Sequence, residues 1–164
     1  LLDFSDILKK NILRRTQAIS VNPDAEGLVL IAYGDATYTR EWTNLLNDVG
    51  EYVKLNTGVD THSYGWCGHV AHYNPDSTSI AINRVLKDKQ TALVVPVLVA
   101  HDEMFQVKII GDGIRNIKNS KEKVKYIADA ILPDPNVENW VIDVVVEYAN
   151  KIKKNATIAS ATNQ

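Results

Sequence analysis

The stretch TALVVPVLVA, residues Thr91–Ala100, carries the strongest β-strand signal in this chain of 164 residues. Eight of its ten residues are small or branched apolar side chains (roughly the composition that pleated, buried backbone favours), and the run is too short for an independent helix. Pro96 has no N–H to donate to a neighbouring strand, so pairing should be interrupted there or leave that nitrogen free. The stretch therefore predicts a strand.

Three more strand candidates lie around this run. Leu28–Tyr33 (LVLIAY) is a short apolar run that Gly34-Asp35 ends, and it is typical of a strand covered on both faces. Val59–Trp66 is a weaker, more polar candidate, and Val124–Ala130 is the fourth. The chain thus alternates strands with other elements at the spacing expected of a layered α/β domain.

Apolar residues at helical spacing separate these strands. Phe4–Ile19 forms a leading helix, and a stripe that begins at Trp42 ends near Gly58. Asn74-Pro75 and Asp134-Pro135 each resemble a helix start, with a capping residue followed by proline. The last helix should bury its stripe, namely Val137, Trp140, Val141, Val144, Val145 and Tyr148, and both Trp42 and Trp140 are expected in the core.

The order of these elements predicts one α/β domain with three layers, in which helices flank a mainly parallel four-stranded sheet. Residues 1–22 are expected to form the leading helix, which could connect to a missing upstream lobe. Residues 23–154 would form the α/β domain, with an irregular polar segment at 111–123, and the small polar residues 155–164 a flexible tail.

Composition excludes several function classes. The 18 basic and 20 acidic residues give a net charge of −2, so nothing favours a nucleic-acid partner. The single cysteine, Cys67, excludes an internal disulfide and a zinc site made of cysteines alone. No apolar run is long enough for a membrane span. A cytoplasmic location is expected, with an exported form left open because a targeting segment could precede Leu1.

Ligands of parallel sheets bind at the carboxyl ends of the strands, and this rule selects three loops. The loop after the second strand carries His69 and His72, and the loop after the third carries His101 and Glu103. Imidazole and carboxylate together suit a divalent metal ion and can also accept protons near neutral pH. A single loop histidine is more often an ordinary surface residue, so the hypothesis depends on the loops meeting.

Other residues of these loops have competing interpretations. Tyr33-Gly34-Asp35 is either a plain turn or a place where backbone approaches a ligand. Trp66 could line a pocket for a flat ligand. His62 is expected to be structural, and Cys67 has no surroundings typical of a nucleophile. Gly111-Asp112-Gly113 lacks the spacing of a phosphate-binding loop, so no nucleotide cofactor is expected.

Several of these segments together resemble one known family. The segments are LVLIAYGD at the first strand, SYGWCGHVAHYNPD at the second, VVPVLVAHDEMF at the third and AILPDPNVENWVIDVVVEYA near the end. They resemble one lobe of the class II chelatases of the CbiX type, the sirohydrochlorin cobaltochelatases and ferrochelatases. The resemblance covers most of 27–151. It implies a lyase that inserts cobalt or ferrous iron into a tetrapyrrole, as in cobalamin or siroheme biosynthesis, with the metal as substrate.

The resemblance also implies roles for particular residues. His101 and Glu103 would be catalytic, and the metal-binding set would be His69, His72, His101 and Glu103. The substrate-binding residues would be Tyr33, Gly34, Asp35, Trp66, Met104 and Phe105, with Lys108 and Arg115 near the carboxylates of the ring. A second lobe or a homodimer partner is implied as well.

The first motif of the family is a His-Gly-Ser turn, and Tyr33-Gly34-Asp35 stands in its place. This replacement keeps two alternatives open: a non-catalytic module that binds metal or tetrapyrrole, and a structural lobe of a two-lobe chelatase.

Overall fold

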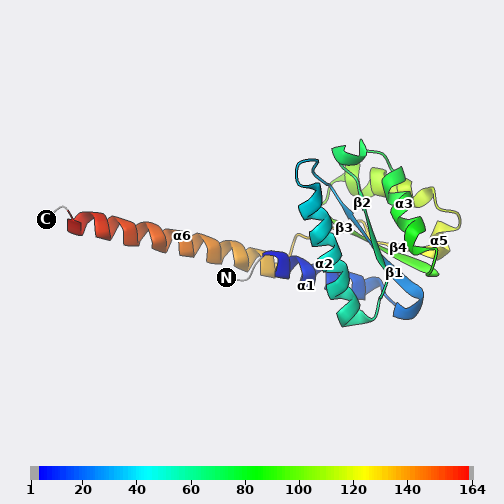
Figure 1. The fold of residues 1–164 in the computed structure, drawn as a ribbon, viewed down its shortest axis with the longest axis horizontal. Coiled ribbons are helices and arrows are strands. Elements are labelled where there is room, and N and C mark those ends of the chain that lie inside the picture. The colour runs from blue at the N-terminus through cyan, green and yellow to red at the C-terminus, as the bar shows by residue number, and fades with distance from the viewer. Residues whose placement is uncertain (1–3, 163–164) are drawn as a thin grey trace.

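The computed structural model describes residues 4–162, with side chains described through residue 156. Figure 1 shows the alternation of helices and strands. The strands are β1 (Glu26–Ala32), β2 (His62–Trp66), β3 (Thr91–Val97) and β4 (Val124–Tyr126). The helices are α1 (Phe4–Ile19), α2 (Thr39–Thr57), α3 (Asp76–Val85), α4 (Gly111–Arg115), α5 (Ser120–Lys123) and α6 (Pro135–Thr162), with a π-helix η3 (Glu103–Ile110) and 3-10 turns η1 (Pro23–Ala25) and η2 (His69–Ala71).

The four strands form one sheet in the order β2-β1-β3-β4, and each neighbouring pair is parallel. Leu28 of β1 lies opposite His62 of β2 on one side and Leu93 of β3 on the other. Every residue of β1 is buried, because neighbouring strands cover both edges and helices cover both faces. The predicted α/β class with a parallel four-stranded sheet is confirmed, and Pro96 lies within β3 itself.

Two apolar clusters, one on each face of the sheet, hold the layers together. On the first face, α1 and α2 pack on alternate residues of β1 and β3, with Ile12, Leu46 and Val49 fully buried. On the second face, α3 and η3 cover the residues in between, with Ile82 and Ile110 fully buried. The carboxyl ends of β1, β2 and β3 consequently meet at one edge.

Helix α1 belongs to this domain rather than standing apart from it. Leu8 and Ile12 are buried against the sheet face and α2, and Ile7 is buried as well. The buried Asn11 donates its amide to the carbonyl oxygen of Ile131 at 3.1 Å and to Asp134 Oδ2 at 2.7 Å. The helix predicted at Phe4–Ile19 is confirmed, and it contributes to the same core as the rest of the chain.

Several predicted segments have other bounds in the structure. β2 begins at His62 rather than at Val59, and β3 ends at Val97 rather than at Ala100. The segment 111–123, expected to be irregular, contains the short helices α4 and α5, because Gly113 is buried against α3, Ile117 is buried in the core and α5 packs on β4 and β3. The fourth strand ends at Tyr126 rather than at residue 130, since beyond it the chain leaves β3.

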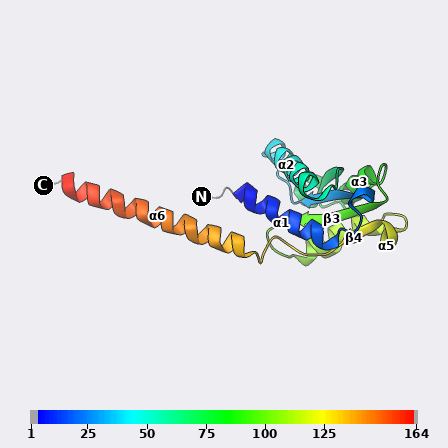
Figure 2. The same cartoon turned by 90° about the horizontal axis from the view of Figure 1, so that it is seen from below.

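The last helix departs most from expectation. Asp134 accepts a hydrogen bond from the Asn136 backbone N–H at 2.9 Å and so starts α6 as predicted. The helix then continues to Thr162, past the predicted end near Lys154, and projects away from the sheet in both views (Figures 1 and 2). Trp140 is only partly buried, against Phe4 at 5.2 Å between ring centres. The expectation of a buried stripe is therefore wrong beyond Trp140.

Candidate functional site

Four rings from three separate loops meet at the carboxyl edge of the sheet. Tyr33, which follows β1, lies 5.3 Å from the ring centre of His69 and 5.3 Å from that of Phe105. Tyr73 stacks on Phe105 at 6.4 Å. The Tyr33 hydroxyl lies 3.2 Å from the Tyr73 hydroxyl and 3.2 Å from His69 Nδ1. We call Tyr33, His69, Tyr73 and Phe105 the aromatic cluster.

Local backbone packing places the β1 and β2 loops in contact. The Gly68 N–H donates to the carbonyl oxygen of Tyr33 at 3.0 Å, and a Cβ at Gly68 would lie 2.6 Å from that oxygen. Only glycine fits at such an approach. His72 and Tyr73 then take left-handed backbone angles, and the Tyr73 N–H returns to the Gly68 carbonyl at 3.0 Å. This tight turn brings the Tyr73 ring over Phe105.

The loop after β3 presents an imidazole and a carboxylate side by side. His101 Nδ1 lies 3.0 Å from the carbonyl oxygen of Ala128, so Nδ1 is the donor there. In the neutral ring this leaves the lone pair of Nε2 free, and Nε2 lies 3.9 Å from Glu103 Oε1. Both side chains are exposed. The pair could therefore accept a proton or bind a cation from solvent.

One residue that supports this loop was not anticipated from the sequence. Gln106 is fully buried, accepts from the Asp102 N–H at 2.9 Å, and donates to the carbonyl oxygens of Ala100 and Asp129 at 3.2 and 3.1 Å. The Tyr126 hydroxyl donates to its backbone carbonyl at 2.7 Å. The available signal was a lone amide inside the mainly apolar stretch MFQVKII, whose other polar residue is Lys108. Buried amides of this kind are normally satisfied and fix their neighbours in place.

The four predicted metal ligands do not form one centre. Within residues 4–162, no three His, Cys, Asp or Glu side chains are grouped so that they could hold a metal ion. His69 turns toward the Tyr33 hydroxyl, whereas His101 turns toward the Ala128 carbonyl. His72 is exposed at the end of η2. The expectation of a joint site for His69, His72, His101 and Glu103 is thus corrected to a pair, His101 and Glu103.

Some of the remaining predicted residues shape the turn at the carboxyl edge of the sheet, and the others face solvent. Asp35 Oδ1 accepts the Thr37 N–H at 2.7 Å and so forms the turn that precedes α2. Gly34 has a φ of +83°, and a Cβ there would lie 2.9 Å from the Trp66 ring. Met104 is half exposed in η3. Lys108 is exposed, and Arg115 is paired with Asp112 on α4.

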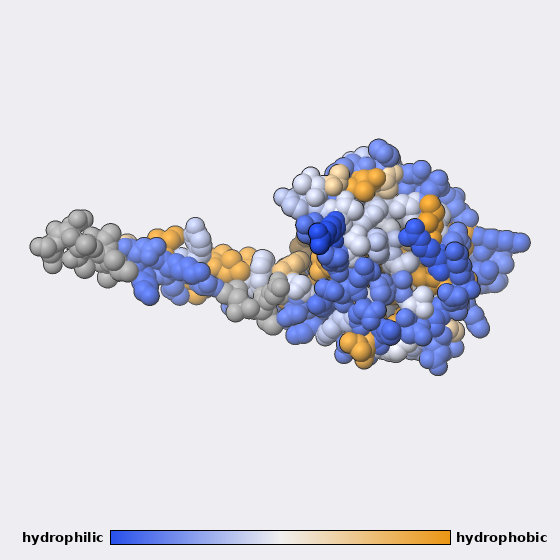
Figure 3. Space-filling model, viewed as in Figure 1, coloured by the Kyte–Doolittle hydropathy of each residue, from blue (hydrophilic) through white to orange (hydrophobic). Residues whose placement is uncertain are grey.

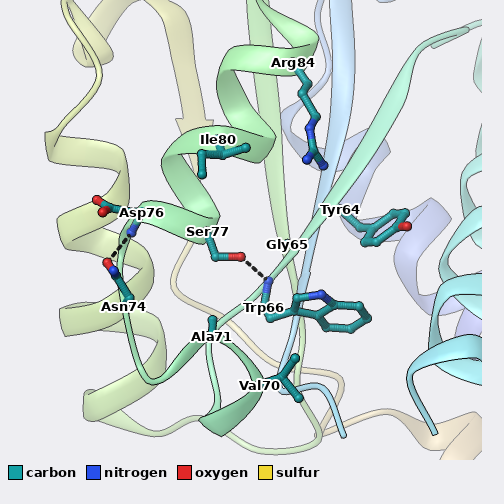
Figure 4. Close-up of a pocket in the computed structure, with 10 residues that line it drawn as sticks. All are labelled: Tyr64, Gly65, Trp66, Val70, Ala71, Asn74, Asp76, Ser77, Ile80 and Arg84. Carbon is teal, nitrogen blue, oxygen red and sulfur yellow. Dashed lines mark hydrogen bonds between the residues drawn. The ribbon is translucent and has the colours of Figure 1, made fainter. Parts of the chain in front are cut away.

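A cavity of about 500 Å³ opens beside the free edge of β2, between that strand and α3 (Figure 4). Trp66 lies in its wall, as expected for a pocket residue, with Tyr64 at 5.6 Å between ring centres. Arg84 extends from α3 at the end of the cavity away from Val70. Ser77 Oγ accepts the Trp66 N–H at 2.9 Å and joins the two walls. Apolar rings, the Arg84 guanidinium and the Asp76 carboxylate thus line this cavity.

The surroundings of Cys67 and His62 indicate structural roles. Burial raises the pKa of Cys67 to about 12, so the thiol stays protonated and is a poor nucleophile near neutral pH. His62 packs against α2, where a Cβ at Gly50 would lie 2.4 Å from its ring, and its Nε2 lies 3.1 Å from Asn47 Oδ1. Burial lowers the pKa of His62.

A scan of the chain against protein-family models finds no match, and a search of curated proteins finds none either. Among the helices of residues 4–162, none combines the length and the apolar character that crossing a membrane requires.

Proposed function

We propose that the carboxyl edge of the sheet binds a tetrapyrrole and transfers a divalent metal ion, cobalt or ferrous iron, to it. The proposal is carried by two groups of side chains from the loops at one sheet edge, the aromatic cluster and the His101–Glu103 pair. Aromatic side chains supply the apolar surface that a flat macrocycle needs, and the polar pair supplies ligands and a base. The sequence resemblance to the class II chelatases supports the same assignment.

The chemistry of insertion fits a small, open set of ligands. Two pyrrole N–H protons must leave while the metal ion passes from protein ligands to the ring nitrogens. His101 Nε2 would accept a proton or hold the metal ion, and Glu103 would share either task across 3.9 Å. Two exposed ligands release a metal ion readily, whereas a closed set of four would retain it. Lys108, exposed in η3, would face the ring carboxylates.

The proposal is tested by mixing the protein with sirohydrochlorin and Co²⁺ or Fe²⁺ and following the absorption spectrum. We expect acceleration over the uncatalysed rate, and a loss of about 10²-fold or more for His101→Ala if the imidazole acts as base or ligand. Glu122→Gln, on exposed α5, is the control for Glu103→Gln, because it removes the same charge outside the site. Insertion at the uncatalysed rate by folded wild-type protein would exclude the activity.

A second candidate is a module that binds the ring or the metal ion without catalysis. It is favoured by Tyr33, which stands where the family has its first-motif histidine. The hydrogen bond with Tyr73 raises the pKa of Tyr33, so the phenol stays neutral and is a weaker metal ligand than imidazole. Calorimetric binding of sirohydrochlorin or Co²⁺ without turnover would select this candidate. Binding should then weaken in Phe105→Ala or His101→Ala, respectively.

A further inference from the structure

One buried side chain holds both peptide groups that flank His101. Gln106 accepts the Asp102 N–H at 2.9 Å and donates to the Ala100 carbonyl oxygen at 3.2 Å. The first contact fixes the peptide group that follows His101, and the second fixes the peptide group that precedes it. The two backbone dihedral angles of His101 lie between these planar groups, so the Gln106 amide restrains both angles.

The same amide holds the segment that orients the His101 ring. Gln106 Nε2 donates its second hydrogen to the Asp129 carbonyl oxygen at 3.1 Å. The preceding carbonyl, that of Ala128, is the acceptor of His101 Nδ1 at 3.0 Å. The Asp129 N–H donates to the Ile127 carbonyl oxygen at 2.8 Å and so closes a tight turn around Ala128. Gln106 therefore ties the backbone of His101 to the backbone that supplies the acceptor for its ring.

Contacts from other elements hold this arrangement in place. Arg15 of α1 is largely buried, donates through Nε to Asp129 Oδ2 at 3.0 Å and pairs through Nη2 with Oδ1. The Tyr126 hydroxyl of β4 donates to the Gln106 backbone carbonyl at 2.7 Å. Gln106 itself lies in η3, and π-helices are rare and occur frequently at functional sites. Both ends of the Gln106–Asp129 contact are thus fixed from a second side.

This frame has a chemical consequence for the imidazole. A carbonyl oxygen only accepts hydrogen bonds, so the contact with Ala128 requires the proton on His101 Nδ1. Free neutral histidine instead carries its proton mainly on Nε2. The hydrogen bond made by one ring nitrogen decides whether the other can bind a metal ion or accept a proton. Without the Ala128 contact, Nε2 would hold the proton in most molecules and have no lone pair to offer.

We infer that Gln106 is a positioning residue for His101, which it keeps in the Nδ1–H tautomer with the Nε2 lone pair free, 3.9 Å from Glu103 Oε1. The inference rests on the proposed function only for the use of that lone pair as a ligand or base.

The first test reads the His101 tautomer from the nitrogen-15 shifts of the ring in the folded chain, without metal, at a pH where imidazole is neutral. His101→Ala identifies its signals among the four histidines. We expect Nδ1–H in the wild type and a shift toward Nε2–H in Gln106→Met, which keeps the side-chain length but has no amide. Ser63→Ala is the control, because it removes a buried hydrogen bond to the Ala81 carbonyl outside η3 and should leave the tautomer unchanged.

A second variant keeps the test decisive where Gln106→Met does not fold, which near-ultraviolet circular dichroism checks. Gln106→Asn retains the amide but is one methylene shorter, so it cannot reach all three partners and should shift the tautomer in the same direction. An Nε2–H ring in the wild type overturns the inference. So does a folded Gln106→Met or Gln106→Asn that retains the wild-type tautomer.

Calorimetric titration with Co²⁺ separates this inference from the proposed function. We expect roughly 10-fold weaker binding in Gln106→Met, as for other residues that orient a metal-binding imidazole. The tautomer is measured without metal, so the two results are independent. Co²⁺ binding that His101→Ala leaves unchanged would therefore contradict the metal role of His101 and not the positioning role of Gln106.

Discussion

Glu26 is a buried carboxylate at the first position of β1, and only 2% of its surface is exposed. Lys125 Nζ lies 2.6 Å from Oε1, Ser20 Oγ donates to Oε2 at 2.6 Å, and the Val21 N–H donates to Oε1 at 3.0 Å. Burial alone would raise the pKa of Glu26, but these hydrogen bonds outweigh it and lower the pKa below its ordinary value of 4.5. The charged carboxylate thus joins β1 to β4 and to the segment after α1.

This arrangement predicts a dependence of stability on acid. A carboxyl group whose pKa is lower in the folded state stabilises that state above about pH 4.5, and the contribution disappears as the pH falls through the folded-state pKa. We expect Glu26→Gln to cost about 2 kcal/mol at pH 7 and less at low pH. Urea unfolding between pH 3 and pH 7 measures this. Glu122→Gln, on exposed α5, should leave the pH profile unchanged, and an equal loss at both ends of the range would contradict the role of charge.

At the scale of elements, α1 is attached to the segment before α6 by a buried amide. Asn11 donates to the Ile131 carbonyl and to Asp134, and Arg14 also pairs with Asp134 at 3.0 Å. Asn11→Ala would remove this buried donor from both the Ile131 carbonyl and the Asp134 carboxylate. We expect a loss of about 2–4 kcal/mol in the free energy of unfolding, measured with urea. Lys10→Ala, on the exposed side of α1, is the matched control, and a comparably small loss in both variants would refute the role of Asn11.

Elements whose pattern is decided locally could be predicted from the sequence. The predicted runs at 28–33 and 91–100 match strands at 26–32 and 91–97, because buried strands are apolar on both faces. Helix α2 ends before Gly58, whose φ is +82°. The helices within 111–123 could not be predicted, because their own sequence is polar and tertiary packing stabilises them, α4 against α3 and α5 against β4 and β3. Tertiary contacts decided these elements.

The candidate site was predictable in position but not in detail. The rule for parallel sheets correctly brought Tyr33, His69 and Phe105 to one edge. The directions of the imidazoles could not be foreseen, because they depend on a hydroxyl and a carbonyl from distant segments. The role of Gln106 depends in the same way on the carbonyl of Asp129, which only the fold places beside it.

At the scale of the whole molecule, the domain and the projecting helix α6 differ in burial. The central strand β1 is buried along its whole length, whereas seven apolar side chains of α6 between Val141 and Ile152 are between 37% and 67% exposed (Figure 3).

The strand order also has a consequence for biosynthesis. Because β1 lies between β2 and β3, with Leu28 paired to both His62 and Leu93, a nascent chain emerging from the ribosome completes one side of β1 well before the other. Until β3 has emerged, the unpaired backbone N–H and C=O groups on one side of β1 can pair with strands of other chains. One side of β1 therefore stays without its neighbour throughout the interval between translation of Trp66 and of Val97.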